Sequence, residues 1–413
     1  MAPASNKLPS IRLTSLFLRF VGFWVATTAR EQWILDFALS YTVIAVIWGT
    51  GVIMMDAYYS IGDFNRFAYA LTNVMTLLMV LFKVVIFGIK RQKMVELIKY
   101  SKKNFWEADY DDIGKKVLND CEKECFVFVC AFTVFALGTV ISYTITPIID
   151  NRGRNETDRN LPFNIWIDVP ATTTPYFEII FVIQTLSSFH VGIIYFCFDN
   201  LLCIFNVHVA GQFRILNSRL AIAVCDVGKE HKTNGTANLT ANEKSLFDPY
   251  HSLQTIKTCI RQHQGLISFV EEMESTYSLC ILGQVLVLSA LTCLVAYQAF
   301  LVSGPFLRRI IFITHCSGTF TQLFMFTLTC HKLWDASVEV NDAAFYSGWH
   351  LLNSDNFPAV SLKRDILLMM MRAQRPCCLT AFGFFPVSLE TFMKINSTAI
   401  SYLTLLRQSA GDN

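Results

Sequence analysis

The chain has 413 residues, of which 53% are hydrophobic, 14% aromatic and only 16% charged, and its formal net charge is +2. Ordinary soluble domains carry about 25% charged residues, so this composition is typical of a membrane protein. The near-neutral charge provides no basic surface for a phosphate backbone, and we expect no nucleic-acid partner.

Residues 1–33 are expected to form a cytoplasmic N-terminal segment. Within it, Leu13–Thr27 is predicted to be a short amphipathic helix at the inner membrane surface. A signal peptide is not expected, because Arg19 divides the apolar part and no small-residue cleavage site follows.

Seven stretches are long and apolar enough to be predicted as spans, since a spanning helix needs about 20 mostly apolar residues. In chain order they are Phe37–Met55, Phe67–Ile89, Phe126–Ile149, Ile179–Phe198, Ser275–Leu301, Ile310–Cys330 and residues 380–406. Lipid cannot pair backbone groups, so such runs form helices or a closed barrel, and the lack of strict alternation excludes the barrel. The predicted fold class is therefore all-α, with seven transmembrane helices.

The segments between the spans differ in character. The loop at about 150–176 carries the sequon Asn155-Glu156-Thr157, which makes Asn155 a candidate glycosylation site. The polar stretch Asp226–Glu243 is predicted to be a mobile loop. A helix from about Leu253 is expected to run on into the fifth span, and a second helix is expected at about Ala359–Ala373. These extensions divide the chain into a six-helix ligand-sensing region (34–330), a cytoplasmic anchor segment (331–376) and a last span with the C-terminus (377–413).

The distribution of Lys and Arg predicts the orientation. If the loops alternate between two sides, one side holds 25 of these residues and the other holds seven. The positive-inside rule then places the N-terminus in the cytoplasm and the C-terminus outside. This argues against a G-protein-coupled receptor, which has its N-terminus outside, and the last span also lacks an Asn-Pro-x-x-Tyr motif.

The last predicted span is unusually polar for a lipid anchor. At helical spacing it places Thr391, Lys394, Thr398, Ser401, Leu405 and Gln408 on one face. A polar stripe on a spanning helix faces water or another polar surface, unless its hydroxyls bond to carbonyls of their own helix. Lys394 is expected to pair with Glu390 in the i, i+4 arrangement.

Signatures of enzymes are absent. The sequence contains no H-E-x-x-H, G-x-G-x-x-G, G-x-x-x-x-G-K-[ST] or G-x-S-x-G motif, and its 13 cysteines show no C-x-x-C spacing. His190 and His315 lie inside spans but are isolated, which favours a satisfied or ligand-facing histidine over a metal ligand. We therefore expect no enzymatic activity and no cofactor.

Three blocks near the C-terminus carry a family resemblance. "VNDAAFYSGWHLL" (340–352), "KRDILLMMMRAQRP" (363–376) and "LTAFGFFPVSLETF" (379–392), followed by Ser401-Tyr402, resemble the C-terminal signature of insect odorant receptors. The match covers about a sixth of the chain. Two positions depart from it, since Phe345 stands where the family commonly has Tyr and Phe382 where it commonly has Gly.

The resemblance implies a ligand-gated, non-selective cation channel. In that family a variable odorant-sensing subunit assembles with the shared co-receptor Orco as a heterotetramer, in the dendritic plasma membrane of olfactory sensory neurons. The expected partners are then a small volatile odorant, Orco, membrane lipid and permeant cations. The last helix would line the pore, with Leu405 at the gate position and Gln408 a turn beyond it, and Trp349 and Tyr402 are assigned to assembly.

The resemblance also implies where an odorant binds, namely between the second, third, fourth and sixth spans in the outer leaflet. The candidate residues there are Tyr69, Asn73, Phe135, Thr139, Tyr143, Phe177, Phe181, Gln184, Ile313, Cys316 and Phe320. Their aromatic character, with few donors and no charge at depth, indicates a small, uncharged, mainly apolar ligand bound chiefly by shape.

Two other classes remain as alternatives. A gustatory receptor of the same superfamily would form a channel without the co-receptor, but Ser401-Tyr402 and the Glu390-Thr391-Phe392 block favour the odorant branch. A transporter would require internal inverted repeats and paired charges within the membrane, and the sequence indicates neither.

Overall fold

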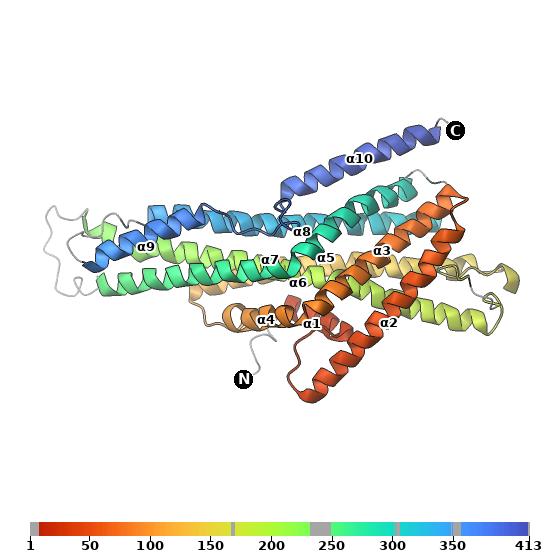
Figure 1. The fold of residues 1–413 in the computed structure, drawn as a ribbon, viewed down its shortest axis with the longest axis horizontal. Coiled ribbons are helices and arrows are strands. Elements are labelled where there is room, and N and C mark those ends of the chain that lie inside the picture. Colours follow the sequence, from red (N-terminus) through yellow and green to blue (C-terminus); the bar gives the residue numbers. More distant parts are fainter. Residues whose placement is uncertain are drawn as a thin grey trace.

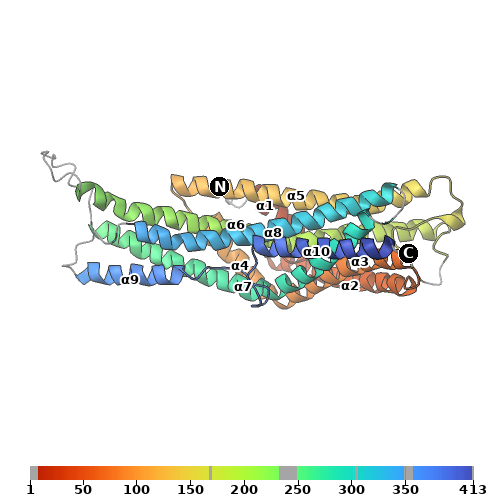
Figure 2. The same cartoon turned by 90° about the horizontal axis from the view of Figure 1, so that it is seen from above.

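The structure, a computed structural model, describes residues 8–166, 170–231, 249–300, 302, 306–347, 349 and 357–411. In these ranges the chain is almost entirely helical, and its extended pairing is limited to an isolated bridge between Thr380 and Pro386. Figures 1 and 2 show that most of the long helices lie along one axis, whereas the red and orange helices near the N-terminus cross it obliquely in Figure 1. The all-α fold class is confirmed.

The α-helices are α1 (Pro9–Val21), α2 (Ala29–Tyr59), α3 (Phe64–Ile89), α4 (Arg91–Ser101), α5 (Asp112–Asp150), α6 (Tyr176–His231), α7 (Pro249–Phe300), α8 (Phe306–Tyr346), α9 (Phe357–Ala373) and α10 (Leu389–Gly411). A π-helical turn, η2 (Lys102–Trp106), follows α4, and a 3-10 turn, η3 (Glu156–Asp158), lies between α5 and α6. We call the end of the bundle with η3 and the α2–α3 turn the loop end, and the opposite end the α9 end (Figure 1).

Six of the described helices are long and apolar enough to cross a bilayer, namely α2, α3, α5, α6, α7 and α8. They contain the first six predicted spans, except for Leu301 at the end of the fifth, which lies outside the described residues. The seventh predicted span began at residue 380, but α10 begins only at Leu389, because residues 379–387 form a tight turn. In that turn Ala381 and Val387 donate backbone hydrogen bonds to Phe385 and Leu379.

That turn explains one departure from the family signature. Phe382 has a φ of +51° and Gly383 a φ of +79°, so both lie in the left-handed region that favours glycine. The resemblance expects Gly at the first of these positions. The phenyl ring is 56% exposed, so the position holds a large side chain without burying it.

Helical extensions project well beyond a bilayer. The 52 residues of α7 span about 78 Å, against a hydrocarbon core of about 30 Å. The predicted helix from Leu253 into the fifth span is confirmed as part of α7, and the one predicted at Ala359–Ala373 is confirmed as α9, which lies against α8 and α7. The predicted loop Asp226–Glu243 is wrong for its first six residues, which belong to α6, and its remainder lies outside the described residues.

The predicted amphipathic helix Leu13–Thr27 is displaced along the chain. The observed α1 ends at Val21, because Gly22 adopts a left-handed φ of +91° and donates its backbone N–H to Arg19. A Cβ on Gly22 would lie 2.4 Å from the Leu35 carbonyl oxygen. α1 packs against α6 and α5, and Glu122 accepts hydrogen bonds at 2.7 Å from the N–H and the hydroxyl of Ser10.

The packed core centres on α6, which contacts α8, α5, α1 and α7. From Ile194 to Leu216, α6 is buried at every position except half-buried Tyr195 and exposed Arg214. The other half of α6, from Tyr176 to Ile193, is half-buried or exposed at most positions. The bundle is therefore dense in the middle and looser at the loop end.

Candidate ligand cavity and candidate pore face

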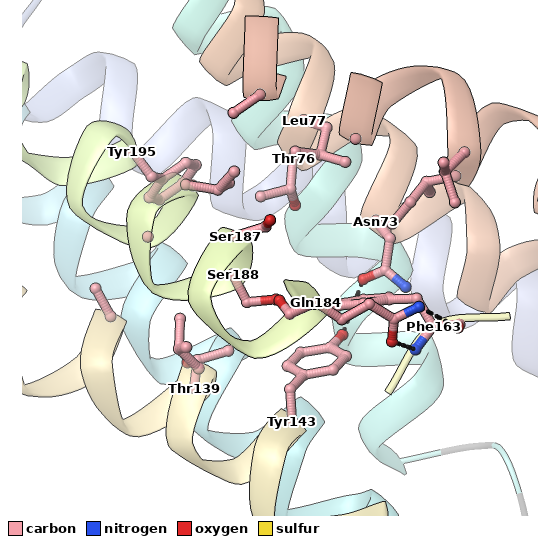
Figure 3. A pocket seen from close by; sticks show the side chains of 18 of the residues that line it. Asn73, Thr76, Leu77, Thr139, Tyr143, Phe163, Gln184, Ser187, Ser188 and Tyr195 are labelled. Atoms are coloured by element: carbon pink, nitrogen blue, oxygen red, sulfur yellow. Dashed lines mark hydrogen bonds between the residues drawn. The ribbon is translucent and has the colours of Figure 1, made fainter. Parts of the chain in front are cut away.

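A cavity of about 520 Å³ lies between α2, α3, α5, α6 and α8, in the part of the bundle nearer the loop end. Its walls are mostly aliphatic and aromatic, and the labelled side chains in Figure 3 converge on it from α3, α5 and α6. The described lining residues include no Asp, Glu, Lys or Arg. Clefts of this size and character are typical of small-molecule sites.

Five of the predicted ligand residues line this cavity. They are Asn73, Phe135, Thr139, Tyr143 and Gln184. They come from α3, α5 and α6, so the structure brings together residues that lie up to 111 positions apart in the sequence. Their contact with an odorant is a matter for the proposal below.

The other six predicted ligand residues do not line the cavity. Tyr69 packs edge-on against Phe312 and borders a separate polar pocket. Phe177 and Phe181 stack on each other, with ring centroids 6.0 Å apart. On α8, Ile313 is exposed, Cys316 packs against the main core, and the Phe320 ring lies 5.2 Å from Phe392 of α10.

Polar groups near the loop end of the cavity satisfy one another. The Tyr143 hydroxyl donates to Asn73 Oδ1 at 3.0 Å. The Gln184 amide donates to the Phe163 carbonyl at 2.8 Å and accepts the Phe163 backbone N–H at 3.1 Å (Figure 3). Phe163 also stacks on Tyr143, so the segment around it forms a roof over this end.

A second set of contacts holds the roof segment around Phe163 in place. Asp56 of α2, only 5% exposed, accepts hydrogen bonds from the Asn164 side-chain amide at 3.2 Å and from the Trp166 indole N–H at 3.1 Å. The Trp166 ring stacks on Tyr59 with centroids 4.5 Å apart. The roof is thus tied to both α2 and α6.

The sequence did not lead to the prediction of the α8 wall of the cavity. His315, Gly318, Thr319 and Gln322 of α8 line the cavity at the i, i+3, i+4, i+7 spacing of a single helix face. The ligand residues predicted on α8 were instead Ile313, Cys316 and Phe320, and His315 was predicted to be an isolated membrane histidine. The i, i+3, i+4, i+7 recurrence of small and polar residues was the available signal.

Beyond the cavity, toward the α9 end, lies a buried ion pair. Lys83 of α3 donates to both carboxylate oxygens of Asp199 on α6 at 2.8 Å, and their side chains are 0% and 4% exposed. Lys83 also donates to the Tyr195 carbonyl at 3.0 Å. The Asp199 carboxylate accepts from Gln284 of α7 at 3.1 Å and from Gln322 of α8. The expectation that the spans contain no paired buried charges is therefore wrong. The pair could not be recognised from the sequence, because its two members lie 116 residues apart.

The two intramembrane histidines have different surroundings. His190 Nε2 lies 2.8 Å from the Thr42 hydroxyl, and the ring sits beside Phe20 and Tyr41. His315 lines the cavity, is 8% exposed, and its Nδ1 has no hydrogen-bond partner among the described residues.

The last helix presents two faces. Thr391, Ile395 and Ala399 are buried and form the stripe that meets the rest of the bundle, where α10 packs on α7 and α8. Of the six predicted pore residues, Lys394, Thr398, Ser401, Leu405 and Gln408 are exposed, whereas Thr391 is 8% exposed and bonds to the Pro386 carbonyl at the start of the helix.

The hydrogen bonds within α10 are compatible with both interpretations of its polar stripe, namely a face in contact with water and hydroxyls that bond only to their own helix. The Thr398 and Ser401 hydroxyls donate to the carbonyls of Lys394 and Ser397 at 2.8 and 2.9 Å, so they are satisfied within the helix while the face stays exposed. The predicted pairing of Lys394 with Glu390 is confirmed at 2.6 Å.

The remaining predicted sites lie in different parts of the bundle. Tyr402 is 58% exposed on α10, and Trp349 is half-buried and packs against the main core. Asn155 is exposed in the loop directly before η3.

Comparisons with known proteins show the family. The sequence profile described as 7tm Odorant receptor matches residues 63–400. The chain belongs to the odorant receptor family. Odorant receptor 13a of Drosophila melanogaster is 22% identical over 97% of this chain and 96% of its own length, and Odorant receptor Or2 of Anopheles gambiae is 24% identical over 60% and 61%.

Solved structures agree on the fold of the receptor. The insect olfactory receptor OR5 from Machilis hrabei has a TM-score of 0.78 and 15% identity over 97% of both chains. The structure of the same protein in complex with eugenol has a TM-score of 0.80 and 16% identity, covering 98% of this chain and 99% of that one. The chain is accordingly a membrane receptor and not an enzyme.

Proposed function

We propose that the receptor is the odorant-sensing subunit of a ligand-gated, non-selective cation channel that works as a heterotetramer with the co-receptor Orco. The observation that carries this is the 520 Å³ cavity, which is large enough for a small organic molecule and lined by no charged side chain among the described residues. Its proposed site is the dendritic plasma membrane of olfactory sensory neurons, with the N-terminus in the cytoplasm.

The cavity supports an uncharged volatile ligand. Moving an ion into apolar surroundings without a paired charge costs far more than moving an apolar molecule, so charged ligands are disfavoured. The proposed ligand residues are the five predicted residues that line the cavity, namely Asn73, Phe135, Thr139, Tyr143 and Gln184. The Machilis hrabei receptor, whose structure was determined with eugenol, makes eugenol a rational first probe.

The exposed face of α10 supports a role in the pore. A helix that faced only lipid would expose apolar groups, yet this one exposes Lys394, Thr398, Ser401 and Gln408 around the apolar Leu405. Water could fill such a face in an assembled channel, and an apolar ring at Leu405 would close it by dewetting.

The helical extensions support assembly at the α9 end. α9 and the adjoining parts of α7 and α8 pack together far from the cavity. The exposed side chains of Leu367, Leu368 and Met371 on α9 form an apolar surface suited to contact with a neighbouring subunit. Trp349 is proposed to support this region from within and Tyr402 to contact a neighbour through α10.

The decisive experiment is a current recording in cells that express the receptor alone, Orco alone, or both. We expect eugenol or other small volatiles to evoke a cation current that only the co-expressed pair shows and that differs from Orco alone in its odorant profile. An equal current from the receptor alone would favour the gustatory-type channel, which needs no co-receptor. A tag that is accessible in intact cells at the N-terminus would contradict the proposed orientation.

A further inference from the structure

Polar groups are unevenly satisfied around the cavity. At the loop end, Asn73 pairs with Tyr143, and Gln184 pairs with the backbone of Phe163 through both its amide atoms. On α6 the Ser188 hydroxyl is already donated to the Gln184 carbonyl at 2.7 Å. These groups need nothing from a ligand.

His315 differs from all of them. It lies on the α8 wall, is 8% exposed, and its Nδ1 has no partner among the described residues. Its neighbour along the same face, Gly318, has no side chain, and the Thr319 hydroxyl is already donated to the Cys316 carbonyl at 3.0 Å. A neutral imidazole carries one donor and one acceptor, so a buried Nδ1 without a partner is an exception to the rule that buried polar groups are hydrogen-bonded.

Local surroundings give no better partner for this ring. An ordered water needs two to four polar partners, and two other buried lining atoms, Gln322 Oε1 and the Tyr195 hydroxyl oxygen, also have no hydrogen-bond partner among the described residues. Close packing of α5 on α8, where a Cβ on Gly318 would lie 3.4 Å from Phe135 Cβ, leaves apolar surface opposite. A hydrogen-bonding group on a ligand in the cavity would satisfy the imidazole.

We propose that the receptor is tuned to hydroxyl-bearing volatiles, alcohols or phenols, whose hydroxyl group bonds to His315 while the apolar body fills the cavity beside Phe135. The unprotonated nitrogen of a neutral imidazole accepts a hydrogen bond, and a hydroxyl group can donate it. A ketone, ester or ether only accepts, and a hydrocarbon does neither. This inference rests on the proposed function, and it adds the chemical class of the ligand and the residue that selects it.

The test compares matched ligands on the receptor co-expressed with Orco. Hexanol, octanol, cresol and eugenol are each paired with their own methyl ether, which keeps the oxygen but loses the donor. We expect the ether to need a roughly tenfold higher half-maximal concentration than the hydroxyl compound, which is the upper range for one net hydrogen bond. A ratio near one in the wild type overturns the inference whatever the variants do.

Two histidine variants locate the selectivity. His315→Phe removes both ring nitrogens and is expected to bring the ether-to-hydroxyl ratio close to one. His190→Phe makes the same change in a buried histidine that does not line the cavity, and is expected to keep the wild-type ratio. Surface labelling of both variants controls for folding, and His315→Met is a second apolar replacement if the phenylalanine does not fit.

The possible failures can be told apart. A ratio that His315→Phe leaves unchanged assigns selectivity to another residue and overturns the inference. Responses to hydrocarbons or esters but to none of the hydroxyl compounds overturn the inference and leave the proposed function standing. Silence of the co-expressed pair toward every class of volatile overturns the proposed function itself.

Discussion

The two halves of α6 show how one helix serves two purposes. From Ile194 to Leu216 it runs through the centre of the bundle, and its side chains are almost all buried; we call this the packed half. From Tyr176 to Ile193 it borders the cavity on one side and is exposed on another; we call this the cavity half. We therefore expect substitutions in the packed half to act mainly on folding and substitutions in the cavity half to act mainly on ligand binding.

The chemistry of the two halves differs as much as their burial. The packed half contains the buried ion pair of Asp199 with Lys83, which joins α6 to α3. The Asp199 carboxylate also accepts hydrogen bonds from Gln284 of α7 and Gln322 of α8. The residues of the cavity half that line the cavity include only neutral polar groups, such as Gln184 and Ser188. A buried charge is tolerated only when it is paired, whereas neutral groups can sit beside a ligand without such a cost.

The largest expected effect comes from breaking the ion pair. Asp199→Leu leaves the Lys83 ammonium buried and unpaired, which costs about 3–5 kcal/mol of stability, so we expect little mature receptor at the cell surface. The double variant Lys83→Met with Asp199→Leu should recover much of it, because it leaves no unpaired charge. Surface biotinylation and size-exclusion profiles measure both, and equal losses in single and double variants would contradict this account.

Truncating one apolar side chain in each half tests the comparison directly. Phe205 in the packed half is 0% exposed, and Phe205→Ala should cost about 3–5 kcal/mol and lower surface expression. Ile183 lines the cavity and is 55% exposed, so Ile183→Ala should preserve expression and shift the odorant profile. The comparison fails if Ile183→Ala unfolds the receptor or if Phe205→Ala changes only odorant sensitivity.

A similar contrast between two faces applies to α10. Leu405 is 61% exposed, so Leu405→Ser should cost little stability but raise the current without odorant, with a nearly unchanged half-maximal odorant concentration. In a cysteine scan from Lys394 to Gln408, block by a water-soluble thiol reagent should recur at Thr398, Ser401 and Leu405. Uniform protection along the stretch would remove α10 of this subunit from the pore.

The native Cys377, which precedes α10 in the chain, should not interfere with that scan. Burial raises the pKa of the Cys377 thiol to about 11, so it stays protonated and unreactive at neutral pH. The parent receptor, with its native cysteines, is the control, and it should show no block by the same reagent.

The smallest expected effect concerns the roof of the cavity half. Gln184→Leu keeps a similar volume but removes both hydrogen bonds to Phe163, so the roof should open more often. We expect normal expression, roughly fivefold lower odorant sensitivity and a faster decay of current after odorant removal, in line with about 1 kcal/mol for a typical net hydrogen bond. An unchanged decay would show that the roof does not control the ligand.

Much of the architecture was predictable from local sequence. Long apolar runs specify spanning helices wherever they occur, so the first six spans, the continuation of α7 and the short α9 were all located from composition and spacing. The pairing of Glu390 with Lys394 was predictable for the same reason, since both groups lie one turn apart on a single helix. The C-terminal blocks were specific enough to indicate the family.

Only the tertiary structure decided which residues face each other. Asn73 lines the cavity, whereas Tyr69, one turn nearer the loop end on the same face of α3, borders a separate pocket, because the depth at which the other helices and the segment around Phe163 pack against α3 sets where the cavity ends. Lys83 binds Asp199, which lies 116 residues further along the chain. The periodicity of neither helix predicts that the two residues pair. The sequence alone determined the helices and the family, because hydropathy and turn chemistry act within one segment. The cavity, the ion pair and the unpartnered His315 depend on the relative rotation and depth of whole helices, which only packing sets.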